Sequence, residues 1–135
     1  MVSAEVIIII PFHDVDVTRV VWHGHYVKYM EIARCTLLDK INYNYIQMER
    51  SGYSWPVIDL RIRYARPLYF QQKIRVKVRL SEWENRLKIK YLFEDFDTGQ
   101  RLTRAYSVQV AVDIVKNEML LASPEIIYQK LGIKL

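Results

Sequence analysis

The residues best suited to proton transfer are concentrated in one short segment. His13, His23 and His25 are the three histidines of the chain, and Asp14 and Asp16 lie between the first two of them. A carboxylate can attack a carbonyl carbon or activate water, and histidine gains or loses a proton near neutral pH. The segment ends where an apolar pattern predicts a helix, and the first N–H groups of a helix can polarise a carbonyl oxygen. The combination favours acyl transfer or the hydrolysis of an activated ester.

The same residues also have structural interpretations. An aspartate before a helix braces or caps a loop more often than it catalyses, and this applies to Asp14 and Asp16. His23 and His25 could donate hydrogen bonds to backbone carbonyls in a core or an interface. The spacing of the histidines matches no known metal-ligand pattern, so we expect no metal site. Residue types alone leave acyl transfer and a structural role open.

Two hydrophobic periodicities predict the elements that position this segment. A spacing of three to four residues predicts a helix over residues 24–40, with one apolar face formed by Tyr26, Met30, Ala33, Leu37 and Ile41. The polar side of this helix is expected to carry Lys28, Glu31 and Arg34. Alternation predicts strands at residues 5–12, 58–64, 73–80, 87–93 and 106–112. Short helices are expected at 43–51 and, capped by Ser123, at 124–131. This order predicts an α+β fold in which an antiparallel sheet, apolar on one face and basic on the other, wraps a long helix.

Length and charge set the wider limits. We expect one domain over residues 1–135. The apolar run at residues 6–10 is too short for a signal peptide or a membrane span, so a cytoplasmic protein is expected. A net charge of +5 suits an anionic partner, although no aromatic-interleaved motif favours nucleic acid. One sheet around one helix leaves edges to cover, which predicts a homodimer or homotetramer.

The dense segment also carries a family motif. It reads Asp14-Val15-Asp16, then Val20-Val21-Trp22-His23-Gly24-His25-Tyr26, then Glu31-Ile32-Ala33-Arg34. This motif resembles the signature of hot-dog-fold thioesterases of the 4-hydroxybenzoyl-CoA thioesterase type, including the group associated with the Tol-Pal gene cluster. The resemblance implies a hot-dog fold and the hydrolysis of acyl thioesters to free acid and thiol. It implies acyl-CoA or an acyl carrier protein as the substrate, and no cofactor other than the coenzyme A that is part of the substrate.

The resemblance also implies roles for individual residues. The catalytic carboxylate of the family falls on Asp16, as nucleophile or as general base toward water. The oxyanion donor, a backbone N–H at the helix start, falls near His23, whose side chain is implicated as well. Tyr26 and the pair Glu31–Arg34 match positions that look structural. We expect substrate contacts from five further residues: Arg19, Val21, Trp22, Gly24 and Arg66.

Thr18 and Arg19 depart from the family pattern, which has small residues there, usually with glycine second. A bulky cation at residue 19 either changes the conformation of the loop or places a charge at the mouth of the pocket. An alternative function is therefore a non-hydrolytic module that binds acyl-CoA or an acyl carrier. A 3-hydroxyacyl dehydratase ranks lower, since Glu31 is a poor match for its acid.

The expected basic sheet face adds one further hypothesis. Its clearest strand carries Lys73, Arg75, Lys77 and Arg79 at alternate positions. We expect most of these side chains to be solvated. A subset could bind the phosphates of coenzyme A or the acidic surface of a carrier protein.

Overall fold

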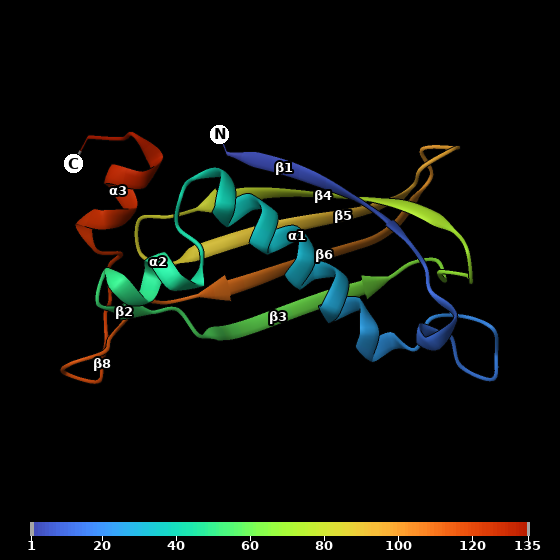
Figure 1. The fold of residues 1–135 in the computed structure, drawn as a ribbon, viewed down its shortest axis with the longest axis horizontal. Helices are drawn as coiled ribbons and strands as arrows, with labels where there is room; N and C mark the ends of the chain where they lie inside the picture. Colours follow the sequence, from blue (N-terminus) through green and yellow to red (C-terminus); the bar gives the residue numbers. More distant parts are fainter. Residues whose placement is uncertain (1, 135) are drawn as a thin grey trace.

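A computed structural model describes residues 2–134, and its centre is one helix enclosed by one sheet (Figure 1). The helix α1 spans Tyr26–Lys40 and is preceded by a single 3₁₀ turn at His23–His25. The sheet has five antiparallel strands in the order β1-β4-β5-β6-β3. Their bounds are Ser3–Ile9 for β1, Lys73–Glu82 for β4, Leu87–Asp95 for β5, Arg101–Gln109 for β6 and Val57–Tyr64 for β3.

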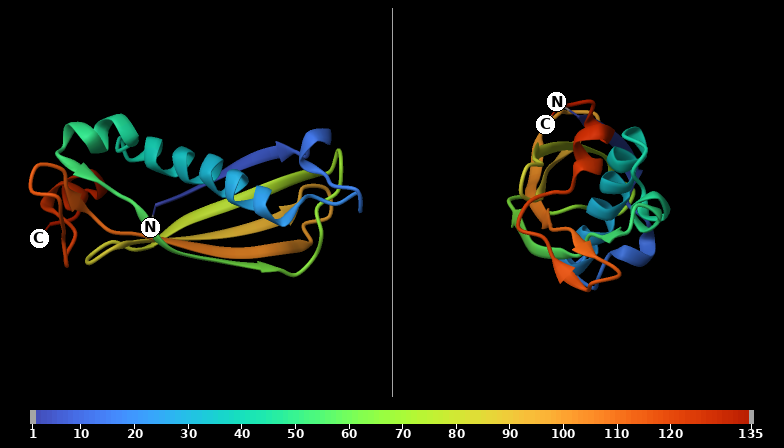
Figure 2. Two further views of the ribbon diagram at one scale, coloured as in Figure 1. Left: turned by 90° about the horizontal axis from the view of Figure 1, so that it is seen from below. Right: turned by 90° about the vertical axis from the view of Figure 1, so that its left-hand side faces the viewer.

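The sheet curves around α1, and the core lies between them (Figure 2). The helix buries the predicted face, including Tyr26, Met30, Ala33 and Leu37. On β4, buried residues alternate with exposed or half-buried cations, so the apolar face of the sheet meets the helix and the basic face points away. Removing this apolar surface from water is the main term that holds the helix against the sheet.

The remaining elements lie beyond the C-terminal end of α1 (Figure 1). They are α2 at Tyr45–Arg50, α3 at Glu125–Leu131, and a small sheet ordered β2-β7-β8 with bounds Tyr53–Ser54, Val112–Asp113 and Glu118–Met119. Asn44 caps α2 through a capping box with Gln47, in which each side chain accepts from the other's backbone N–H. Within residues 2–134, no helix is long and apolar enough to cross a bilayer.

Several predicted boundaries were wrong. The first strand ends at Ile9 because Pro11 lacks the N–H that further pairing needs, and a 3₁₀ turn follows. The last long strand is β6, which runs from Arg101 to Gln109 and starts before the predicted residue 106. The N-cap of α3 is Pro124, with no side-chain cap, so Ser123 does not have the predicted role.

Arg34 is a further correction, because the sequence pattern placed it on the polar side of the helix. The residue is buried, and its side chain contacts Glu31 and donates to the Tyr45 hydroxyl at 2.8 Å. The predicted Glu31–Arg34 pair therefore forms, with the cation inside the fold rather than in solvent.

Candidate active site

Asp14 is a buried anion at the base of the loop between β1 and α1. Lys28 Nζ lies 2.5 Å from its Oδ1, and the Tyr29 hydroxyl donates to Oδ2 at 2.5 Å. Burial raises the pKa of Asp14, but the hydrogen bonds from Lys28 and Tyr29 outweigh it and hold this pKa below its usual 3.8. Its backbone oxygen accepts from the Trp22 N–H at 3.1 Å. Both carboxylate oxygens are thus engaged, and Asp14 braces the loop against the helix.

Asp16 is exposed and lies in a tight turn of the same loop. Its N–H donates to the Val20 carbonyl at 2.9 Å, and its carbonyl accepts from the Arg19 N–H at 2.9 Å. The Thr18 hydroxyl and the Thr18 N–H, the latter at 2.8 Å, donate to Oδ1. These bonds lower the pKa of Asp16. Among residues 2–134, no side chain or backbone N–H donates to Oδ2 of Asp16, so this oxygen of the exposed carboxylate is available to solvent.

Arg19 follows this turn in a left-handed conformation, with φ at +68°. Only glycine adopts this region without steric penalty, which accounts for the glycine in the family pattern. The strain of a non-glycine residue there is about 1–3 kcal/mol. The exposed side chain places a cation in the same turn as Asp16.

The start of the helix is fixed from β3. The Tyr64 hydroxyl donates to the His23 carbonyl at 2.9 Å, and its ring meets the Tyr26 ring edge-on at 4.7 Å between centroids. Among residues 2–134, neither the His23 N–H nor the Gly24 N–H donates a hydrogen bond to a residue outside its own helical turn. Two backbone donors at the positive end of the helix are therefore available to an external oxygen.

Gly24 leaves room for the side chain of Trp22. A Cβ atom on Gly24 would lie 2.2 Å from the indole ring, a distance at which one of the two must move. The indole ring also lies 5.0 Å from the His23 ring and 5.3 Å from the His25 ring, measured between centroids. Gly24 thus allows the half-exposed Trp22 to pack over the helix start.

The predicted site residues gather at one end of the molecule, where α1 begins and β3 ends (Figure 1). Asp16, Arg19, Trp22 and His23 are exposed in one continuous segment, and His23 contributes a small lowering of the pKa of Asp16. Val21 is buried, and its N–H donates to the Leu68 carbonyl, in the connection from β3 to β4, at 2.9 Å. Gly24 is half-buried. Arg66 is exposed in the connection from β3 to β4, at the same end of the sheet.

Three contributors were not found from the sequence. Lys28 and Tyr29 hold Asp14, and Tyr64 fixes the helix start. A cation one helical turn after the aspartate-rich loop was an available signal for Lys28, because a buried carboxylate needs a charged partner. Tyr64 is 41 residues away from His23, and no local pattern announces that contact. The chain shows no cluster of three metal-ligating side chains in residues 2–134.

Comparison with known proteins identifies the family. Residues 10–130 match the Thioesterase-like superfamily. The chain belongs to this superfamily. It is 27% identical over 128 residues to a Synechocystis protein that carries an esterase name, sll0410, covering 94% of this chain and 77% of that protein. It is 27% identical over 103 residues to Bacillus subtilis YneP, which carries an acyl-CoA thioesterase name, covering 76% of this chain and 74% of YneP.

The fold of this thioesterase-like chain is also found in solved structures. Protein TT1821 from Thermus thermophilus superimposes with a TM-score of 0.83 and 26% identity, covering 95% of this chain and 96% of TT1821. The predicted α+β hot-dog architecture is confirmed. The predicted enzyme class, a thioester hydrolase, is confirmed at the level of the family.

Proposed function

We propose that the chain hydrolyses acyl-CoA thioesters at Asp16. The observation that carries this proposal is a carboxylate with a lowered pKa and one unoccupied oxygen, close enough to His23 for that residue to contribute to the lowering of its pKa. Its loop leads to two backbone N–H groups that, within residues 2–134, donate to no residue outside their own helical turn. Asp16 either takes a proton from water as that water attacks the thioester carbon, or attacks the carbon itself. The N–H groups of His23 and Gly24 receive the negative charge that develops on the carbonyl oxygen.

The C–S bond then breaks. In the first route, the proton taken from water passes to the coenzyme A thiolate as the free acid forms. In the second route, water hydrolyses the mixed anhydride on Asp16, which restores the carboxylate, releases the acid and supplies the proton of the thiol.

The coenzyme portion of the substrate is proposed from the cations around the site. Arg19 and Arg66 are exposed at the same end of the molecule as Asp16. One guanidinium group can donate two parallel hydrogen bonds to the oxygens of a phosphate. The acyl-CoA thioesterase name of YneP supports the same substrate class. Trp22, half-exposed beside His23, offers an apolar surface to the acyl group.

We further propose that the protein is a homodimer formed through β3. This strand is an edge of the sheet, and its helix-side residues Ile58 and Leu60 are 56% and 40% exposed. Edge strands with apolar side chains are templates for pairing with another chain, and two-fold pairing of β3 with its copy would continue the sheet. Because Tyr64 ends this strand, the interface would border the His23 end of the site.

The test of the proposed chemistry is thiol release from short, long and aromatic acyl-CoAs by the wild type and by Asp16→Asn. A fall in kcat/KM of about a hundredfold or more is expected from the loss of the base or nucleophile. Asparagine keeps the shape of the side chain and can still accept from Thr18. Equal rates in the two proteins would remove Asp16 from the mechanism. Stoichiometric binding without turnover by the wild type would favour the non-hydrolytic module.

A further inference from the structure

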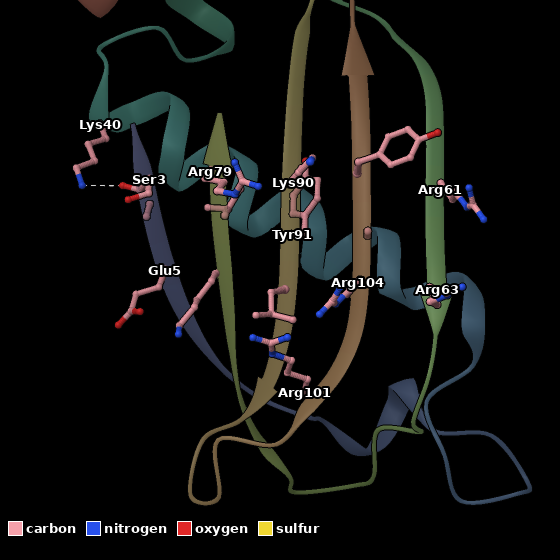
Figure 3. A pocket seen from close by; sticks show the side chains of 16 residues that line it. Ser3, Glu5, Lys40, Arg61, Arg63, Arg79, Lys90, Tyr91, Arg101 and Arg104 are labelled. Atoms are coloured by element: carbon pink, nitrogen blue, oxygen red, sulfur yellow. Dashed lines mark hydrogen bonds between the residues drawn. The ribbon is translucent and has the colours of Figure 1, made fainter. Parts of the chain in front are cut away.

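The sheet face that points away from α1 forms a broad hollow of about 1080 Å³ (Figure 3). Eight exposed cations line it. Two of them have partners, since Lys40 donates to the Ser3 carbonyl and Lys77 pairs with Glu94. The other six are here called the basic face: Arg61, Arg63, Arg79, Lys90, Arg101 and Arg104. They come from four neighbouring strands, β3 to β6, and none of them has a role in the site at Asp16.

The sheet register places cations of the basic face directly opposite each other. Arg79 on β4 is the cross-strand partner of Lys90 on β5, and Arg63 on β3 is the partner of Arg104 on β6. Like charges in such positions destabilise a sheet. Within residues 2–134, no carboxylate lies within 4.0 Å of any of the six cations. The fold therefore tolerates a repulsion that a bound anion would relieve.

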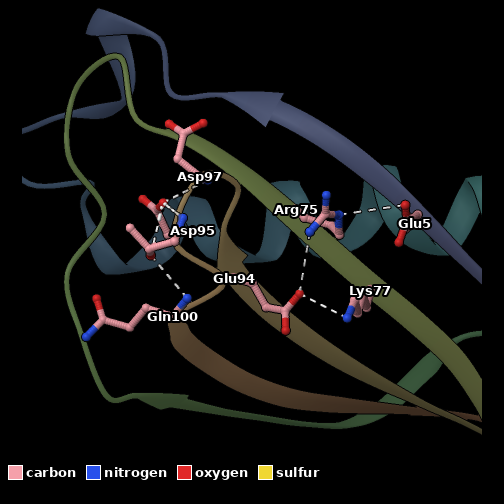
Figure 4. A network of polar contacts seen from close by, with 8 residues as sticks. Glu5, Arg75, Lys77, Glu94, Asp95, Asp97 and Gln100 are labelled. Atoms are coloured by element: carbon pink, nitrogen blue, oxygen red, sulfur yellow. Dashed lines mark hydrogen bonds and ion pairs between the residues drawn. The ribbon is translucent and has the colours of Figure 1, made fainter.

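Two neighbouring cations of β4, Arg75 and Lys77, are paired with carboxylates, in contrast to the six of the basic face. Lys77 lies 3.1 Å from Glu94, and Arg75 lies 3.9 Å from Glu94 and 3.7 Å from Glu5 (Figure 4). Two further acids near the face have other partners: Asp59 accepts from the Tyr106 hydroxyl at 3.3 Å, and Glu82 pairs with Arg86 at 2.8 Å. The uncompensated charge is thus a property of the basic face and not of every cation on the sheet.

The shape and spacing of the basic face favour an acidic helix as its occupant. Neighbouring strands are about 5 Å apart, so the cations form rows with a spacing close to that of carboxylates three or four residues apart on a helix, about 5–6 Å. A helix with its side chains is about 10–12 Å across, which suits a hollow that extends over several strands. A second copy of this face would repel the first.

Two other anionic partners fit less well. Binding of single-stranded nucleic acid relies on several exposed aromatic platforms. Of the two tyrosines that line the hollow, Tyr91 is buried, and Lys88 already lies 4.5 Å from the ring centroid of Tyr106. A bilayer surface is flat and favours inserted apolar side chains, but the lining is concave and contains no large, exposed apolar residue.

We propose that the basic face docks an acidic helix of an acyl carrier protein, which presents its acyl thioester to the site at Asp16. This inference rests on the proposed thioester hydrolysis and names its partner. The face borders that site, because Arg63 directly precedes Tyr64, whose hydroxyl binds the His23 carbonyl. A carrier bound there can reach the helix start with its flexible prosthetic arm.

The experiment compares two substrates with the same acyl group: octanoyl-CoA, and a bacterial acyl carrier protein loaded with octanoate. The variants are Arg79→Glu and Arg104→Glu, and Lys116→Glu in the exposed turn between β7 and β8 is the charge-matched control. We expect kcat/KM for the octanoyl carrier to fall tenfold or more through KM in both face variants. For octanoyl-CoA, kcat/KM of both face variants should stay within twofold of the wild-type value. The control variant should have the wild-type kcat/KM on both substrates. Salt should weaken the carrier reaction of the wild type selectively.

The thermal midpoint separates docking from damage to the fold. Each glutamate would face a cation across the strands, Lys90 or Arg63, so the variants should be as stable as the wild type or more stable. Loss of carrier activity without loss of stability supports the proposal.

Other outcomes overturn it. Equal losses on both substrates would assign the face to the phosphates of coenzyme A, and no loss on either would make it a solvated surface. If a labelled oligonucleotide or anionic vesicles bind more tightly than the carrier, the partner of the face is nucleic acid or a membrane surface and not a carrier protein. If the wild type hydrolyses neither substrate, the proposed chemistry fails, but titration of the labelled octanoyl carrier still decides the docking: weaker binding by Arg79→Glu supports it, and unchanged or absent binding rejects it.

Discussion

Two aspartates separated by one residue have different environments, and their roles differ accordingly. Asp14 is buried with both oxygens hydrogen-bonded, whereas Asp16 is exposed with one oxygen available. In an extended strand, two residues separated by one would point to the same side and share one environment. This segment is not extended, so Asp14 can be buried while Asp16 is exposed. Here Asp14 ends a 3₁₀ turn and Asp16 begins a tight turn.

Asp14 is expected to matter for stability. Asp14→Asn keeps the volume but removes the charge that Lys28 and Tyr29 bind, and should lower the free energy of unfolding by about 2–3 kcal/mol at pH 7. The folded pKa of Asp14 is below its unfolded value, so its contribution is present above the unfolded pKa, near 3.8, and is lost as pH falls through the folded value. Urea unfolding of both proteins at pH 7 and at acid pH measures this. A difference that persists when Asp14 is protonated would contradict the assignment.

Thr18 is expected to set the acid limb of the activity. Its hydroxyl and N–H lower the pKa of Asp16, whose reactive form is the ionised one. Activity is therefore present above this pKa and declines below it. Thr18→Ala removes one of the two hydrogen bonds, so the pKa should rise and the acid limb of kcat/KM should move to higher pH. Profiles that coincide for the two proteins would show that another group controls the limb.

At the scale of elements, the helix start depends on contacts from outside the helix. The sequence pattern predicted a helix near residue 24 and a loop rich in aspartate and histidine before it, and both are present. Periodicity could do this because the helix buries one face over four turns. It could not place Tyr64 on the His23 carbonyl, since that contact depends on how β3 pairs with β6.

Charged residues inside the fold were the other failure of sequence reasoning. Arg34 was assigned to the polar side of the helix and Lys28 had no assigned partner, yet the first is buried and the second binds Asp14. A hydrophobicity pattern assigns every charged side chain to the surface, whereas a charged side chain can be buried when it is paired with an opposite charge and hydrogen-bonded. The alternation on β4 was predicted well, because one of its faces meets the helix and the other meets solvent.

The whole molecule leaves the apolar side of β3 uncovered, and we expect a second copy to cover it. Ile58→Lys places a charge in the proposed interface and should convert the dimer to a monomer, measured by light scattering on a sizing column. Val115→Lys is the matched control, because Val115 is 92% exposed and lies outside β3, in the turn between β7 and β8. Equal masses for Ile58→Lys and the wild type would place the interface elsewhere.

The central claim is that Asp16 carries the chemistry at the start of α1. The most direct measurement is kcat/KM for octanoyl-CoA with Asp16→Asn beside the wild type, together with the thermal midpoint of both. We predict a loss of about a hundredfold or more, with an unchanged midpoint because the Asp16 side chain is exposed. A variant that is as active as the wild type, or that loses activity only by unfolding, would contradict the account.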